Sequence, residues 1–260
     1  MTYFSPSIST AVPRAMPFRH QGLIGVSLAL VICGAWLATH VYAMFFLTIT
    51  TATIPLTVGL AALQCWLSVG MFIVAHDAMH GSLAPGRPQV NARIGAALLL
   101  LYAGFGFSKL RDAHFAHHRH PGSARDPDFD ADHPRSPVRW YWTFLMRYFG
   151  WRSTLYVTVV VQSYYWIVGV PLANLLLLYA LPSILSSVQL FYFGTYRPHA
   201  HRDAGFSDRH NARSEAFGPL VSLATCFHFG YHHEHHVNPN VPWWALPACH
   251  RAALRDGATQ

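Results

Sequence analysis

The sequence predicts an all-α integral membrane protein in which four transmembrane helices carry a histidine-rich cap at their cytoplasmic ends. Only 11% of the 260 residues are charged, compared with about 25% in a typical soluble domain. No Asp, Glu, Lys or Arg occurs at residues 20–76 or 153–196, and each stretch is long enough to cross a bilayer core twice. Three short histidine clusters flank these stretches. Membrane-spanning helices with a metal centre at one membrane surface explain both patterns.

The first uncharged stretch is interrupted by residues 50–55 (TTATIP), whose small polar residues and proline favour a tight lumenal turn. This predicts span one at about 22–48 and span two at about 55–76. Residues 1–20 form a polar lead-in without a cleavage site, so we expect the first apolar run to be retained as a span.

The segment between the two stretches contains a shorter apolar run from Ile94 to Phe107. Because this run is too short to span comfortably, we expect a re-entrant or interfacial helix that leads into the second histidine cluster. A polar, proline-rich loop follows at 121–137. Aromatic residues then suggest a belt at the membrane interface, namely Trp140, Tyr141, Trp142, Phe144, Tyr148, Phe149 and Trp151.

The second uncharged stretch is expected to bend near 169–171 (GVP) and to form spans three and four. Both predicted hairpin turns lack charge, whereas the basic residues lie in the segments on the other side. The positive-inside rule therefore places both termini and the histidines in the cytoplasm, at the inner membrane if the source is bacterial. The net charge of +7 follows from the same pattern, so nucleic-acid binding is not expected. The predicted single domain divides into 1–20 (lead-in), 22–80 (spans one and two), 81–151 (cytoplasmic), 152–196 (spans three and four) and 197–260 (cytoplasmic).

The histidine clusters have the spacing of metal ligands. Residues at i, i+3 and i+4 share one face of a helix, and neutral imidazole is the commonest metal ligand in proteins. Eight such histidines exceed the three or four ligands of a single zinc ion, which predicts a two-metal centre. The eight are His76 and His80, then His114, His117 and His118, then His232, His235 and His236.

Further residues near the clusters are expected to complete the centre. His199 follows span four at the same membrane edge and is predicted to be a ninth ligand. A ligating imidazole usually donates its other N–H to a carboxylate or carbonyl. The residues close enough in sequence to support the ligands are Asp77, Asp112, Asp126, Asp128, Glu234, His120, His228 and His233. The remaining histidines are expected to be structural or exposed, namely His20, His40, His133, His201, His210 and His250.

The ligand type does not identify the metal, because imidazole binds zinc, iron, copper and nickel. Soluble di-iron bundles use Glu-x-x-His motifs. That motif is absent from this chain, whose only glutamates are Glu215 and Glu234. The soluble bundle class is therefore excluded.

The sequence around the clusters resembles a known family, the bacterial-type β-carotene ketolases (carotenoid 4-oxygenases) of the membrane fatty acid desaturase and hydroxylase superfamily. The resemblance extends from span two to near the C-terminus. It is carried by AHDAMHGSLAPG at 75–86, HFAHHRHPG at 114–122, DPDF at 126–129, FYFGTYRPH at 191–199, FHFGYHHEHHVNP at 227–239 and PWWALP at 242–247.

The resemblance implies a non-haem di-iron oxygenase of carotenoid biosynthesis, so that the cap would be a di-iron cap. The eight clustered histidines, and His199 with them, would bind two Fe²⁺ ions. O₂ would be the co-substrate, and an external donor of the ferredoxin type would supply electrons. Two hydroxylations at C4 of a β-ionone ring, followed by loss of water, would convert β-carotene to echinenone and canthaxanthin, and zeaxanthin toward astaxanthin.

A carotenoid would reach such a centre from the bilayer, entering between the spans. Aromatic residues beside the histidine clusters are expected to line its path, although any one of them can instead pack in the core or anchor at the interface. They are Phe105, Phe107, Tyr192, Phe193, Tyr196, Phe227, Phe229, Tyr231, Trp243 and Trp244.

Other functions remain open at the level of sequence. A carotenoid ring hydroxylase or an acyl-lipid desaturase of the same superfamily would carry similar clusters. A histidine-rich metal transporter would place ionisable ligands near the bilayer midplane, whereas here the clusters follow the ends of uncharged spans. A haem-binding cytochrome would need isolated axial histidines within the spans.

Overall fold

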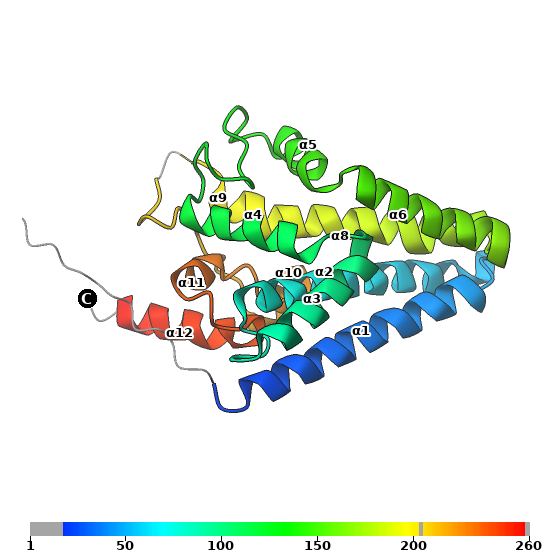
Figure 1. Cartoon of the computed structure of the whole chain (residues 1–260), viewed down its shortest axis with the longest axis horizontal. Helices are drawn as coiled ribbons and strands as arrows, with labels where there is room; N and C mark the ends of the chain where they lie inside the picture. Colours follow the sequence, from blue (N-terminus) through cyan, green and yellow to red (C-terminus); the bar gives the residue numbers. More distant parts are fainter. Residues whose placement is uncertain (1–17, 203–204, 258–260) are drawn as a thin grey trace, which may run out of the picture.

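The computed structural model describes residues 18–202 and 205–257, and every regular element within those ranges is a helix. Long helices run side by side along the molecule, and shorter helices gather at one end (Figure 1). Segments labelled η are short 3₁₀ or π-helical stretches. The elements are α1 (Gln21–Phe45), η1 (Thr51–Thr53), α2 (Ile54–His80), α3 (Pro88–Ala103), α4 (Phe107–Arg119), α5 (Pro137–Tyr148), α6 (Trp151–Gln162), η2 (Ser163–Val168), α7 (Leu172–Asn174), η3 (Leu175–Ala180), α8 (Leu181–Phe191), η4 (Tyr192–Tyr196), α9 (Arg197–His199), α10 (Pro219–Cys226), α11 (His232–Val237), η5 (Trp243–Ala245) and α12 (Leu246–Gly257).

Helices α1 and α2 form the predicted first pair of spans. The turn between them is closed by Thr50, whose backbone N–H donates to Thr53 Oγ1 over 2.8 Å. Helix α2 continues to His80, four residues beyond the predicted end of span two, and stops where Gly81 adopts a φ of 76°. The extra turn places His76 and His80 on one continuous helix.

The predicted re-entrant helix is the C-terminal part of α3, and a separate helix, α4, carries the second histidine cluster. The two helices meet at an angle of 100°. Gly104 ends α3 with a φ of 68°, in the left-handed region that glycine adopts without steric cost. The bend turns α4 toward the last turns of α2.

Within residues 18–202 and 205–257, three helices are long and apolar enough to cross a membrane, namely residues 21–45, 51–80 and 172–199, and the bent pair α3–α4 makes a fourth candidate. The predicted span three is helical from Trp151 to Val168 but is not among these candidates. It contains Arg152, Gln162 and several hydroxyl residues, which lower its apolar character. Span four is the continuous helix formed by α7, η3, α8, η4 and α9.

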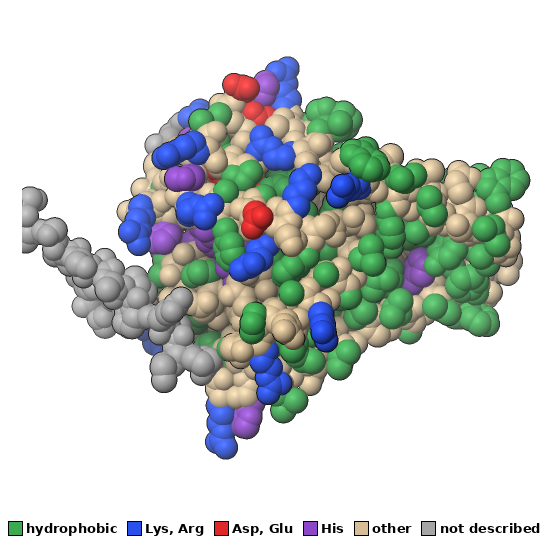
Figure 2. Space-filling view, viewed as in Figure 1, with side chains coloured by type: hydrophobic (Ala, Val, Ile, Leu, Met, Phe, Trp, Pro, Cys, Tyr) green, Lys and Arg blue, Asp and Glu red, His purple; other side chains and the backbone are tan. Residues whose placement is uncertain are grey.

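Apolar and charged side chains occupy different ends of the molecule. Large hydrophobic side chains on the long helices are exposed, among them Leu30 (68%), Trp166 (75%) and Ile167 (81%). Lys and Arg side chains gather at the opposite end, where the short helices lie (Figure 2). Exposed apolar area of this extent is expected where a protein contacts lipid. The structure is therefore that of a membrane protein with a polar cap.

Helix α2 forms the centre of the packing. Val69, Met71 and Ala75 are completely buried, and α1, α3 and α8 pack around α2. The phenyl ring of Phe227 lies so close to Gly70 that a Cβ at that position would be 2.5 Å from the ring. This contact holds the segment before α11 against α2, and so brings the third histidine cluster to the first.

Candidate metal centre

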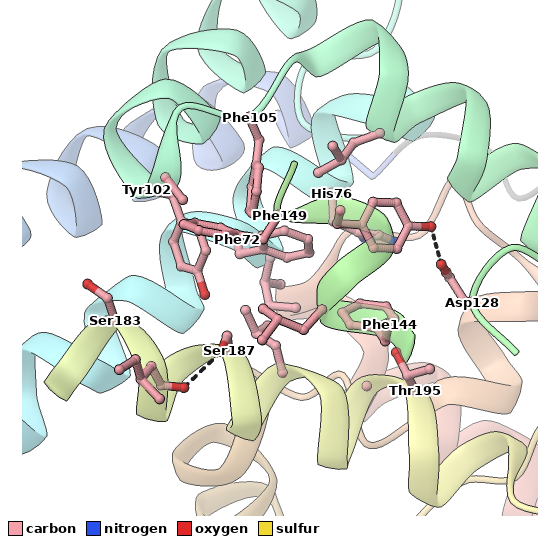
Figure 3. A pocket seen from close by; sticks show the side chains of 18 of the residues that line it. Phe72, His76, Tyr102, Phe105, Asp128, Phe144, Phe149, Ser183, Ser187 and Thr195 are labelled. Carbon is pink, nitrogen blue, oxygen red and sulfur yellow. Dashed lines mark hydrogen bonds between the residues drawn. The ribbon is translucent and has the colours of Figure 1, made fainter. Parts of the chain in front are cut away.

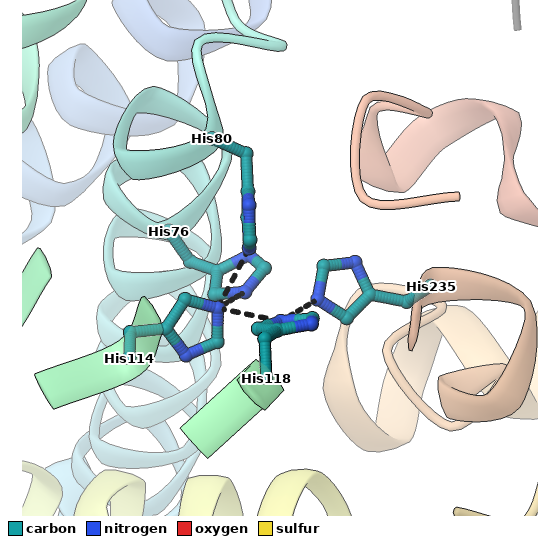
Figure 4. A group of neighbouring side chains, drawn as sticks. All are labelled: His76, His80, His114, His118 and His235. Carbon is teal, nitrogen blue, oxygen red and sulfur yellow. Dashed lines mark hydrogen bonds between the residues drawn. The ribbon is translucent and has the colours of Figure 1, made fainter. Parts of the chain in front are cut away.

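Five histidines from three helices form the first group of the site (Figure 4). Their ligand nitrogens all lie within 4.8 Å of one another. His114 Nε2 is 2.7 Å from Nε2 of both His76 and His80. The group consists of His76 and His80 on α2, His114 and His118 on α4, and His235 on α11.

Four histidines form a second group beside the first, and their ligand nitrogens also lie within 4.8 Å of one another. His199 Nε2 is 2.9 Å from His232 Nε2, and His117 Nε2 is 3.2 Å from His236 Nε2. The rings of His118 and His236 stack with centroids 4.3 Å apart, which joins the two groups. Together the groups contain the nine histidines that the sequence singled out as ligands.

Metal ions explain this arrangement better than hydrogen bonds do. His114 Nε2 faces the Nε2 atoms of His76, His80 and His118 at 2.7–3.0 Å. A neutral ring nitrogen offers either one N–H or one lone pair, so the three contacts cannot all be hydrogen bonds. Lone pairs that converge from several helices fit a metal ion that takes imidazole ligands. Five and four nitrogens in adjacent groups fit two ions.

The three clustered histidines on α11 are suited to bind as neutral bases. His117, His199, His232 and His236 are all buried, whereas His80, His114 and His118 in the first group are half-buried. On α11, burial holds the pKa values of all three clustered histidines well below the usual 6.5, and the neighbouring histidines lower them further. Metal binding requires the deprotonated ring.

Asp126, one of the predicted supporting residues, is hydrogen-bonded to His117. His117 Nδ1 lies 2.9 Å from both carboxylate oxygens of Asp126, and the backbone N–H groups of Gly122 and Asp128 also donate to this carboxylate. Burial raises the pKa of Asp126, but these hydrogen bonds outweigh it and lower the pKa below its ordinary value. The carboxylate therefore fixes the proton on Nδ1 and directs the Nε2 lone pair into the site.

His199 is held by a backbone group that we did not predict from the sequence. His199 Nδ1 donates to the backbone carbonyl of Asn211 over 2.7 Å, and the Asn211 side chain donates to Pro121 O. Asn211 adopts a φ of 43°, a left-handed conformation in which Asn is enriched. Because the acceptor is a backbone carbonyl, no side-chain pattern marks it in the sequence.

Two more of the predicted carboxylates lie beside ligands without a short hydrogen bond to them. Asp77 is 3.9 Å from His76 Nδ1 and accepts the backbone N–H of Trp243 over 3.0 Å. Asp128 is 3.9 Å from His117 Nδ1 and accepts a hydrogen bond from the Tyr148 hydroxyl.

In the described part of the chain, the side chains of the other predicted supporting residues make no hydrogen bond to the rings of the nine histidines. Asp112 is exposed on α4, and the sequence neighbours of the third cluster point away from the site. Glu234 binds Ser214 and His250, His233 binds Asp208 over 2.8 Å, His228 stacks beside Trp243, and the His120 ring approaches none of the nine.

A cavity of about 530 Å³ adjoins the histidines (Figure 3). It is enclosed mainly by α2, α3, α4, α5, α6 and the helix 172–199, and nearly all of its lining is apolar. Histidines from both groups reach it, namely His76, His114, His117 and His232. An apolar molecule in this cavity would therefore contact the metal centre directly.

Most aromatic residues that we expected along a substrate path are not part of this cavity. Only Phe105 and Phe229 line it. Those that do not are Phe107, Tyr192, Phe193, Tyr196, Phe227, Tyr231, Trp243 and Trp244. Proximity to a histidine in sequence was a poor guide, because neighbouring side chains on a helix point in different directions.

The predicted interfacial belt supplies part of the cavity wall instead. Trp142 and Trp151 are 62% and 72% exposed, as expected for interfacial anchors. Trp140 is instead buried, and its indole N–H donates to Asp128 O. The helical spacing of the other four puts them on one face of α5 and its end, a role that we did not predict from the sequence. They are Tyr141, Phe144, Tyr148 and Phe149.

The comparisons with known proteins place this site in a family. The family model described as fatty acid desaturase matches residues 51–160 and 147–260. A β-carotene ketolase from Paracoccus sp. (strain N81106 / MBIC 01143) is 52% identical over 218 residues, which cover 84% of this chain and 88% of the relative. A β-carotene ketolase from Paracoccus sp. (strain PC1) is 47% identical over 233 residues, which cover 89% of this chain and 93% of the relative. A β-carotene ketolase from Haematococcus lacustris is 35% identical over 261 residues, which cover 89% of this chain and 80% of the relative.

The chain therefore belongs to the fatty acid desaturase family and, within it, to the β-carotene ketolases. The resemblance predicted from the residues around the histidine clusters is confirmed. The relatives are named as enzymes, which argues against the transporter and cytochrome alternatives.

Proposed function

We propose that the protein is a β-carotene 4-ketolase that oxidises C4 of β-ionone rings to ketones. The observation that carries the proposal is the apolar cavity that ends on histidines of both groups. The identity of 47–52% to proteins named β-carotene ketolase over most of the chain supports the same substrate class. β-Carotene would yield echinenone and then canthaxanthin, and zeaxanthin would be converted toward astaxanthin.

The nine histidines would hold two iron ions, five in the first group and four in the second. Bound there, the ions supply the reductive activation of O₂ that oxidation of a C–H bond requires. The hydrogen bonds from His117 to Asp126 and from His199 to Asn211 fix these rings with Nε2 directed into the site. Preset ring orientation raises metal affinity.

The cavity contributes position and exclusion of water. Its apolar walls hold the ring beside His76 and His232, and they keep water away from the reacting carbon. C4 is allylic to the conjugated chain, so its C–H bond is weaker than that of an ordinary methylene. Each hydroxylation consumes one O₂, two electrons and two protons and releases one water. The second hydroxylation at the same carbon gives a gem-diol, which loses water to form the ketone.

We also propose how the enzyme lies in the membrane and which partners it uses. The carotenoid would enter from the bilayer, and the cap with both termini would lie in the cytoplasm, where the basic segments favour it. A ferredoxin-type donor would deliver electrons there. The first histidine group is the more accessible of the two, because three of its members are half-buried.

Turnover by the purified protein in lipid nanodiscs tests this proposal. With Fe²⁺, a reduced ferredoxin system, O₂ and β-carotene, we expect echinenone to appear first and canthaxanthin later. Omitting the donor or removing iron with a chelator should abolish both products. Formation of zeaxanthin would instead identify a ring hydroxylase, and unchanged β-carotene with newly unsaturated acyl chains would identify a desaturase.

A further inference from the structure

The cavity is elongated along the helix 172–199. Its lining on that helix extends from Thr195, near the histidines, to Tyr179. At about 1.5 Å per residue, these two positions lie roughly 24 Å apart. A rod-shaped molecule with one end at the metal centre would therefore have its other end near Tyr179.

Tyr179 is a polar group without a protein partner at this deep end of the cavity. The residue is only 8% exposed, and its hydroxyl makes no hydrogen bond with any residue in the described ranges. Buried hydroxyl groups in folded proteins are normally hydrogen-bonded, and leaving one unpaired costs free energy. A ligand atom is a natural partner for this hydroxyl.

A second unpartnered group lies behind Tyr179. The ring of His40 is 5.6 Å from the Tyr179 ring, stacks on Trp36 and is hydrogen-bonded through Nε2 to the Tyr164 hydroxyl over 3.0 Å. His40 is 5% exposed, and its Nδ1 is buried without a partner. Ionisable residues within membrane spans are rare and mark functional sites by default.

We propose that Tyr179, with His40 behind it, forms a polar binding site for the oxygen substituent of the carotenoid ring that is not being oxidised. This inference rests on the proposed ketolase function. The Tyr179 hydroxyl can donate to a ketone oxygen, and it can donate to or accept from a hydroxyl group. An unsubstituted β-ionone ring offers neither. The site therefore favours a substrate whose distal ring already carries oxygen, so that echinenone, the product of the first ketolation, is preferred for the second.

The variant Tyr179→Phe tests the proposal because it removes the hydroxyl and keeps the ring. In membranes supplied with one substrate at a time, we expect the ratio of kcat/KM for echinenone to kcat/KM for β-carotene to fall about fivefold, the effect of one net hydrogen bond. Tyr165→Phe is the matched control, because Tyr165 is 39% exposed on the outer surface and does not line the cavity. Its ratio should equal that of the wild type.

A binding measurement without turnover separates this inference from the proposed function. The purified protein is equilibrated with equal amounts of canthaxanthin and β-carotene in detergent, and the retained pigments are extracted and quantified. Wild-type protein and Tyr165→Phe should retain an excess of canthaxanthin, and Tyr179→Phe should lose most of that excess. Equal retention of both pigments by the wild type, or an unchanged excess in Tyr179→Phe, would overturn the polar site even if the enzyme is a ketolase.

Discussion

At the scale of single residues, the sharpest expectation concerns His117. This histidine belongs to the second group and is held by Asp126. We predict that His117→Ala abolishes ketone formation and lowers the iron content of the purified protein. His120→Ala is the matched control, because His120 is close by at the end of the same helix and its ring lies outside both groups. If His117→Ala retained full iron and activity, the ligand assignment would be wrong.

The carboxylate beside His117 provides a second prediction. Each oxygen of Asp126 accepts a backbone N–H in addition to the contact with His117, so the amide nitrogen of Asp126→Asn would face a donor. We expect this variant to lose about 10–100-fold in iron affinity or activity. Asp112→Asn should behave as the wild type, because Asp112 is exposed and away from the histidines. Titration of both apoproteins with iron measures their iron affinities. Equal affinities would contradict the role of Asp126 in supporting His117.

The sequence was most informative where spacing alone determines geometry. The i, i+3 and i+4 pattern identified the eight clustered histidines, and the position after span four added His199, which the structure places in the second group. The same reasoning failed for Asp112 and Glu234. Sequence proximity to a ligand says nothing about the direction of a side chain, and the carbonyl of Asn211 has no side-chain signal at all.

At the scale of elements, the bend between α3 and α4 determines where the second histidine cluster lies. Gly104 has a φ of 68°, and an added Cβ would lie 2.6 Å from the Tyr156 ring. Gly104→Ala is therefore expected to destabilise the protein by more than about 1 kcal/mol and to lower its iron content. Gly106→Ala, with open space around the site of the Cβ, should change neither. Thermal unfolding in detergent measures the difference, and equal Tm values for the two variants would contradict the account of the bend.

Uncharged stretches predicted the existence of the long helices well, because a lipid environment requires both apolar side chains and internal backbone hydrogen bonds. Helices α1, α2 and the helix 172–199 follow from this requirement. The structure of residues 94–119 was only partly predicted. The apolar run suggested one re-entrant helix, whereas Gly104 divides the region into two helices of different direction.

At the scale of the whole molecule, the function depends on contacts between distant parts of the sequence. The cavity combines α2, α3 and α4 with α5, α6 and the helix 172–199, and it reaches histidines of both groups. No local pattern encodes which face of each helix meets the others. For that reason the aromatic wall contributed by Tyr141, Phe144 and Tyr148 was mistaken for an interfacial belt alone.

The central claim is that this membrane enzyme oxidises C4 of a carotenoid ring that lies in the apolar cavity next to the histidines. Pigment analysis of a bacterial host that accumulates β-carotene and expresses this chain tests the claim most directly. We expect echinenone and canthaxanthin to appear in the extracted pigments and to be absent from cells that carry the empty vector. Unchanged β-carotene, or zeaxanthin without any 4-keto product, would contradict it.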